Sequence, residues 1–163
     1  MADSERQFEC DIEKYLISSE GGWRQAHDCG YRAGNGDGYA LDIATLIGFI
    51  RDTQPKAWAR FEKMNPTNTE HTFYQSFEDS VNNDGLISVL RHGFKHLGIE
   101  FKVCYFMPEN SLNQTATEHY KQNVCHCIRQ WHYTTENNNS VDMMLAVNGI
   151  PLVAIELKKV LEN

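Results

Sequence analysis

The sequence of 163 residues contains no apolar run that approaches the roughly 18 residues of a membrane-spanning helix. Its start, Met-Ala-Asp-Ser-Glu-Arg, is not followed by the apolar segment of a secretory signal. The five cysteines are odd in number and form no Cys-x-x-Cys pair, unlike the cysteines of a secreted disulfide scaffold. We therefore expect a cytoplasmic protein with reduced cysteines and no membrane segment.

Positive charge is also scarce. Lysine and arginine total 15 against 22 aspartates and glutamates, which gives a formal net charge of −7. This sign is wrong for a protein that holds nucleic acid by bulk electrostatics, so any DNA would have to be delivered by something else. The 41% hydrophobic and 23% charged residues are ordinary globular usage, and the length predicts a single domain over residues 1–163.

The spacing of apolar residues predicts that the first hundred residues are mostly helical. A first helix over residues 5–18 has one apolar face and places its acidic residues on the opposite side. That apolar face comprises Phe8, Ile12, Tyr15 and Leu16. A glycine-rich stretch over residues 21–38 is expected to be a connecting loop. The further helices are expected at residues 42–50, 55–61, 69–84 and 86–92.

Beyond Gly98 the pattern changes to strands. We expect an α/β fold in which a helical part, residues 1–98, packs on a mixed, largely antiparallel sheet from residues 99–163. Residues 141–158 are almost entirely apolar, as in central strands covered on both faces, and Asn148-Gly149 predicts a hairpin. The predicted strands are residues 99–106, 124–133, 140–147 and 150–158, with a helix at 111–122 between the first two.

Three charged residues interrupt the apolar hairpin: Asp142, Glu156 and Lys158. Charged side chains are rarely buried unless they are paired or bind a metal. Glu156 and Lys158 are two residues apart, so they leave the same face of a strand. A two-residue Asn-Gly loop would set Asp142 opposite Ile155 and leave the two carboxylates on opposite faces.

A three-residue loop over residues 147–149, with Gly149 as a bulge, would instead pair Asp142 with Ala154. Glu156 would then be a same-face diagonal neighbour of Asp142, so both carboxylates could bind one ion. We predict this longer loop.

Two carboxylates beside a lysine suit Mg²⁺, which takes oxygen ligands and keeps several waters. Lys158 could orient or deprotonate a water, or offset charge on a phosphate. The competing interpretation is a solvated strand end, or a Lys158–Glu156 ion pair without a metal.

The same segment resembles a known nuclease motif. Asn-Ser-Val-Asp142, followed by Asn-Gly-Ile-Pro-Leu-Val-Ala-Ile-Glu156-Leu-Lys158-Lys, resembles the nuclease motif of type I restriction enzyme R subunits, members of the PD-(D/E)xK superfamily. The resemblance covers most of residues 5–160. It extends upstream to residues 53–58, 69–71, 89–93 and 113–123, and to Arg129-Gln130 with Tyr133.

The resemblance implies a restriction-endonuclease-like fold whose C-terminal helix and strand are missing from this chain. Asp142 and Glu156 would bind Mg²⁺, with Mn²⁺ as a substitute, and Lys158 would be the catalytic lysine. The carbonyl of Leu157 would complete the protein ligands. A catalytic glutamate is expected on the first helix, with Glu9 the candidate and Glu13 the alternative. Arg129 and Lys159 are the candidate DNA contacts, and solvation at the sheet edge is the other interpretation of Arg129.

Two functional hypotheses follow. The first is a Mg²⁺-dependent endonuclease domain that hydrolyses phosphodiester bonds of double-stranded DNA after ATP-driven translocation. Its partners would be the methylase and specificity subunits of a type I complex. The chain contains no Walker A sequence, so ATP would be required by motor domains of the parent protein and not bound here. The second hypothesis is a noncatalytic, nuclease-like module that docks on the motor or methylase subunits.

Overall fold

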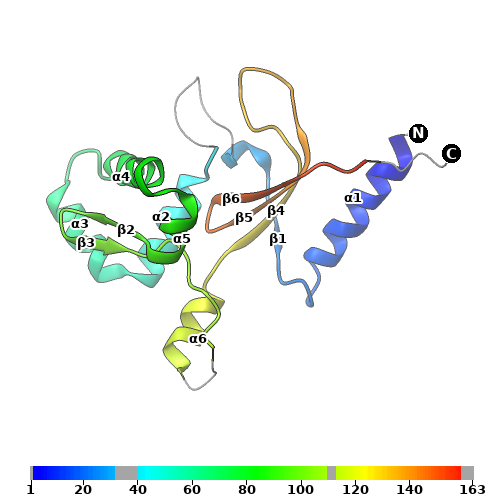
Figure 1. Ribbon diagram of the computed structural model, residues 1–163. Helices are drawn as coiled ribbons and strands as arrows, with labels where there is room; N and C mark the ends of the chain where they lie inside the picture. Colours follow the sequence, from blue (N-terminus) through cyan, green and yellow to red (C-terminus); the bar gives the residue numbers. More distant parts are fainter. Residues whose placement is uncertain (1, 32–39, 110–112, 159–163) are drawn as a thin grey trace. The chain divides into compact units, whose positions relative to one another are not determined.

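The computed structural model describes residues 2–31, 40–109 and 113–158. Two compact units make up the chain: unit 1 contains residues 1–42 and 124–163, and unit 2 contains residues 43–123 (Figure 1). The boundaries of these units do not coincide with the expected division at residue 98, because the N-terminal helix groups with the sheet. The single domain over 1–163 stays a prediction. No helix in the described ranges is long and apolar enough to cross a membrane.

Unit 1 is built on a four-stranded sheet in the order β1-β4-β5-β6. The strands are β1 (Arg24–Gln25), β4 (Cys125–Trp131), β5 (Val141–Val147) and β6 (Ile150–Ile155). β1 is parallel to β4 and the other pairs are antiparallel, so the α/β fold with a mixed, largely antiparallel sheet is confirmed. A short 3-10 helix, η1 (Asp28–Tyr31), follows β1, and buried Tyr31 packs with Ile128, Met144 and Ala146.

The expectation that both strands of the hairpin are central is wrong for β6. In the described part of the chain β6 is an edge strand, and Leu152 and Val153 are exposed. The predicted strand at 150–158 also ends at Ile155, so Glu156 to Lys158 follow it outside any strand.

Unit 2 contains the predicted helices in sequence order. They are α2 (Ile43–Thr53), α3 (Pro55–Met64), α4 (Thr69–Asp84), α5 (Leu86–His92) and α6 (Gln114–Lys121). Pro55 fits the first position of α3 because its missing N–H is not needed there. The core is aromatic: Phe61 and Phe73 contact each other edge to face, and each also contacts Trp58 and Phe101.

The predicted sheet strand at residues 99–106 is wrong. Only Ile99–Phe101 forms a strand, β3, and it pairs with β2 (Phe94–His96) in a separate two-stranded sheet. The reason is a tight turn at Leu97 and Gly98, whose φ angles of 45° and 77° are those of a two-residue hairpin. The main sheet instead gains β1, from the glycine-rich segment expected to be a loop.

The predicted apolar face of the first helix is also wrong. In α1 (Ala2–Leu16), Phe8 and Tyr15 are exposed, whereas Glu9 and Glu13 are only 3% and 7% exposed. These glutamates lie one turn apart and face the sheet, where Arg129 of β4 binds both of them. A long-range ion pair therefore determines which side of the helix is buried.

Candidate functional site

The turn between β5 and β6 contains two residues, so the predicted three-residue loop is wrong. Val147 pairs with Ile150. Asn148 and Gly149 have φ angles of 51° and 84°, the combination that a two-residue hairpin turn requires. The Asn148 side chain is buried and accepts a 2.7 Å hydrogen bond from the backbone N–H of Val124, which ties the turn to the start of β4.

A bulge in β6 changes the register beyond this turn. Ala146 pairs with Pro151 but Leu145 pairs with Val153, so Leu152 is the extra residue. The shifted register continues to Met143 and Ile155, the last pair of the ladder, and extrapolating it by one residue would set Asp142 opposite Glu156. Without the bulge Asp142 would face Ile155. The bulge therefore does what the longer loop was predicted to do, because opposed residues of antiparallel strands share a face.

Asp142 and the Glu156–Lys158 segment are in direct contact. The backbone N–H of Leu157 donates a 2.6 Å hydrogen bond to Oδ2 of Asp142, which is half-buried. Glu156 and Lys158 are exposed, and among the described residues neither side chain forms a hydrogen bond or an ion pair. The ion pair between these two side chains, one of the alternatives to a metal, is thus not formed. Lys159 lies outside the described residues.

The donor set suits a hard cation. Asp142 Oδ1 and the Glu156 carboxylate accept no hydrogen bond within the described residues, and Leu157 adds a backbone carbonyl. These are oxygen donors only. The described ranges hold no group of three or more His, Cys, Asp or Glu side chains arranged to bind a metal. Mg²⁺ does not need such a group, because one or two carboxylates with waters and substrate phosphate can hold it.

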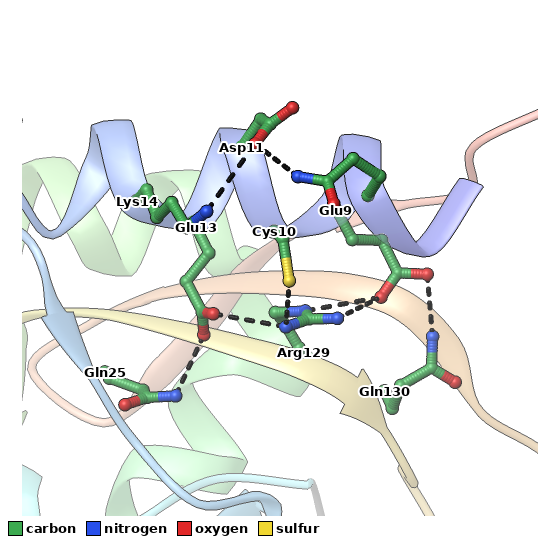
Figure 2. Close-up of polar contacts among 9 residues, drawn as sticks. Glu9, Cys10, Asp11, Glu13, Lys14, Gln25, Arg129 and Gln130 are labelled. Atoms are coloured by element: carbon green, nitrogen blue, oxygen red, sulfur yellow. Dashed lines mark hydrogen bonds and ion pairs between the residues drawn. The ribbon is translucent and has the colours of Figure 1, made fainter. Parts of the chain in front are cut away.

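A second polar cluster joins α1 to β4 (Figure 2). Nε and Nη2 of Arg129 donate to Oε2 of Glu9 at 3.3 and 3.2 Å, and Nη1 donates to Oε2 of Glu13 at 3.3 Å. Nη1 also lies 3.1 Å from Sγ of Cys10. We call Glu9, Glu13 and Arg129 the α1 clamp. On the solvent side of α1, Asp11 and Lys14 form a 3.9 Å ion pair.

Two glutamines outside the α1 clamp donate hydrogen bonds to its glutamates. The Gln25 amide donates to Oε1 of Glu13 at 3.1 Å, and the Gln130 amide donates to Oε1 of Glu9 at 3.0 Å. Burial works against the charge of Arg129, but its hydrogen bonds to Glu9 and Glu13 outweigh this and raise its pKa. Burial, with a contribution from Glu13, raises the pKa of the nearby Cys127 thiol to about 11. This cysteine is therefore protonated at neutral pH.

Gln130 also marks an irregularity in β4. Its φ angle is 49°, and the ladder to β5 runs from Arg129–Met143 to Trp131–Val141 without a pair at Gln130. The position opposite this gap on β5 is Asp142. The kink lets Arg129 and Gln130 both face α1, while the indole of Trp131 donates to the carbonyl of Tyr31 at 2.8 Å.

The structure does not bring every predicted site residue together. Glu9 binds Arg129 and Gln130, and has no direct contact with Asp142 among the described residues. Met144 and Ala146, which alternate with Asp142 on β5, pack with Tyr31. Met143, the ladder partner of Arg129, belongs to the other face. Glu9 therefore lies on the face of the sheet that α1 covers. Its link to the Asp142 end of the sheet is the hydrogen bond from Gln130.

A polar cavity of about 440 Å³ adjoins the α1 clamp. Its lining includes Glu13, Gln25, His27, Asp28, Arg129 and Gln130. Asp28 also binds Nδ1 of His132 at 2.8 Å. Sequence analysis gave no site role to Gln25, Gln130 or Asp28, although Gln130 belongs to a segment that carries the family resemblance, because these residues meet their partners only in the folded sheet.

Comparison with protein families places the chain in a known family. A model described as the type I restriction enzyme R protein N terminus matches residues 19–163. Comparisons with curated proteins and with solved structures find no match. The matched region covers the whole sheet and the Asp142 to Lys158 segment, but it begins after α1.

Proposed function

Because the chain belongs to the family of type I restriction enzyme R protein N termini, we propose that it is the Mg²⁺-dependent endonuclease domain of an R subunit. The observation that carries the proposal is the contact between Asp142 and the Glu156–Lys158 segment, which the bulge at Leu152 makes possible. The substrate would be double-stranded DNA, moved by ATP-driven motor domains outside this chain. The methylase and specificity subunits would complete the complex.

Asp142, Glu156 and the carbonyl of Leu157 are the residues that would hold Mg²⁺, with Mn²⁺ as a substitute. When bound, the metal supplies positive charge against the reacting phosphate. Lys158 follows Glu156 by two residues, is exposed and has no partner in the described part of the chain. Its ammonium can orient a water molecule or offset charge that develops on the phosphate. Glu9 is assigned to the same site because it binds Gln130, which lies opposite Asp142.

The chain's charge of −7 agrees with a domain that cuts DNA which motor domains deliver to it. Phosphate contacts from lysine and arginine dominate nonspecific affinity for DNA, and a strongly acidic domain has few of them. A domain that receives DNA from a motor does not need to capture it alone.

Separate assays of cleavage and translocation in the complete complex test the proposal. Asp142→Asn, Glu156→Gln and Lys158→Met are each expected to abolish double-strand cleavage while ATP-driven translocation continues at the wild-type rate. The matched control is Lys121→Met, an exposed lysine of unit 2, which should leave both activities intact. Retained cleavage in the Asp142 or Glu156 variant would contradict the proposal.

One observation favours a second function, a noncatalytic docking module. β6 exposes Leu152 and Val153 at the edge of the sheet, and exposed apolar edges are places where another chain can add a strand. If docking is the function, the three site variants would leave cleavage unchanged, whereas Val153→Lys would weaken assembly of the complex.

A further inference from the structure

We propose that Arg129 is a positioning residue of the nuclease site and not a contact to DNA. In this inference, which rests on the proposed function, the α1 clamp fixes the end of β4 that faces Asp142. Glu9 then acts through Gln130 and is not itself a metal ligand.

Arg129 has few N–H donors left for a phosphate. Nε, Nη1 and Nη2 all donate to Glu9, Glu13 or Cys10, and the side chain is 26% exposed. These contacts use four of the five N–H groups of the guanidinium, so a forked, two-bond contact to a phosphate would pull it away from the two glutamates. Breaking a buried pair by withdrawing one partner is strongly unfavourable, because it leaves an uncompensated charge. Here it would leave two uncompensated carboxylates, those of Glu9 and Glu13.

Both carboxylate oxygens of Glu9 are held by β4. Oε2 accepts both bonds from Arg129, and Oε1 accepts the bond from Gln130. The two partners are consecutive residues of β4, so one carboxylate spans the point where the ladder to β5 is interrupted. A rotation of α1 or a loss of Arg129 would release both contacts together.

The interruption of the ladder at Gln130 has a strained backbone. Gln130 has a φ angle of 49°, a conformation that costs a residue other than glycine about 1 kcal/mol, and its side chain is exposed. The only interaction that holds its amide among the described residues is the bond to Glu9. Asp142 is the residue of β5 opposite Gln130. A fixed conformation of Gln130 therefore holds the β4 backbone in one position beside the Asp142 backbone. Partners that orient metal ligands in this indirect way typically change metal affinity by about 10- to 100-fold.

The test is a calorimetric titration of the chain with Mn²⁺ alone. Arg129→Met and Glu9→Gln should each raise the Kd for Mn²⁺ by about 10-fold. Arg129→Lys keeps the charge but loses the forked contact, so its Kd should lie between those of the wild type and Arg129→Met. Gln130→Gly should have the same effect, and the Arg129→Met/Gln130→Gly double variant should be no weaker than the worse single variant. Arg24→Met is the control, because it removes one exposed positive charge from the same unit.

Binding to a DNA duplex, measured against salt concentration, distinguishes the other role of Arg129. The slope of log K against log salt is negative, and if Arg129 contacts a phosphate the slope should become less steep by about 0.9 in Arg129→Met, whereas a positioning role leaves it unchanged. A less steep slope with wild-type Mn²⁺ affinity would overturn the inference. So would complete loss of Mn²⁺ binding in Glu9→Gln together with wild-type binding in Gln130→Gly, because Glu9 would then be a ligand.

The outcomes separate this inference from the proposed function. If the wild-type chain binds no Mn²⁺, with or without DNA, the proposed function fails and the inference fails with it. If the wild type binds Mn²⁺ and the variants at Glu9, Arg129 and Gln130 all bind it as tightly as the wild type does, only the inference fails. Should Arg129→Met not fold, Gln130→Gly still decides, because its side chain is exposed and glycine accepts the backbone conformation without strain.

Discussion

The backbone N–H of Leu157 donates a 2.6 Å hydrogen bond to Oδ2 of Asp142, across the ends of β5 and β6. This bond joins the two parts of the candidate site, which lie 15 residues apart in the chain. It uses one oxygen of Asp142 and turns the Glu156–Lys158 segment toward it. The relationship leads to a prediction that concerns stability alone.

Asp142→Ala should lower the free energy of unfolding by about 1.5–3 kcal/mol, because the charged acceptor of the Leu157 N–H is lost. Asp142→Asn keeps an acceptor oxygen in the same place and should cost less than about 1 kcal/mol. Urea denaturation of both variants measures the difference. Equal stabilities of the two variants would show that the bond contributes nothing to the fold.

The Asn148-Gly149 turn carries the second prediction. Asn148→Ala removes the acceptor of the Val124 N–H and places an alanine at a φ of 51°, so we expect a loss of about 2–3 kcal/mol. Asn148→Gly loses the same side chain but avoids the backbone strain, because glycine adopts positive φ freely, and should be about 1 kcal/mol more stable than the alanine variant. Thermal or urea unfolding checks the order; an alanine variant as stable as the glycine variant would contradict it.

How far the sequence predicts this site depends on the range of the interactions. The helices of unit 2 and the β5–β6 hairpin follow from local spacing, from Pro55 and from the Asn-Gly pair. The bulge at Leu152 has no local signal, and a search for same-face carboxylates pointed to a longer turn instead. The inward face of α1 was also predicted wrongly, because Arg129 lies 120 residues beyond Glu9 and reverses the preference that apolar spacing suggests.

The third prediction concerns pH. The pKa of the Cys127 thiol is raised from 9.0 to about 11 in the folded protein, so the unfolded chain loses this proton first. Stability due to the neutral thiol is therefore complete below pH 9 and is lost as the pH rises toward 11, by about 2 kcal/mol.

Cys127→Ala should be less stable at neutral pH, because Cys127 is fully buried, but should lose less stability between pH 9 and 11. Urea unfolding at several pH values measures the difference between the two proteins, in which the contributions of other titrating groups cancel. Parallel curves would refute the assignment.

The fourth prediction concerns the aromatic core of unit 2. Phe61→Ala should cost about 3–5 kcal/mol, because this fully buried ring contacts Trp58, Phe73 and Phe101. Met64→Ala, on the same helix but exposed, should change stability by less than about 0.5 kcal/mol and serves as the control. Unfolding followed by tryptophan fluorescence distinguishes them, and a small effect of Phe61→Ala would mean that unit 2 repacks around the gap.

The central claim is that Asp142 and Glu156 share one cation, and calorimetric titration of the chain with Mn²⁺ tests it most directly. The account predicts saturable binding by the wild type that disappears in both Asp142→Asn and Glu156→Gln, with both variants folded as judged by circular dichroism. Binding that persists unchanged in either variant, or a wild-type chain that binds no Mn²⁺ with or without DNA, would contradict it.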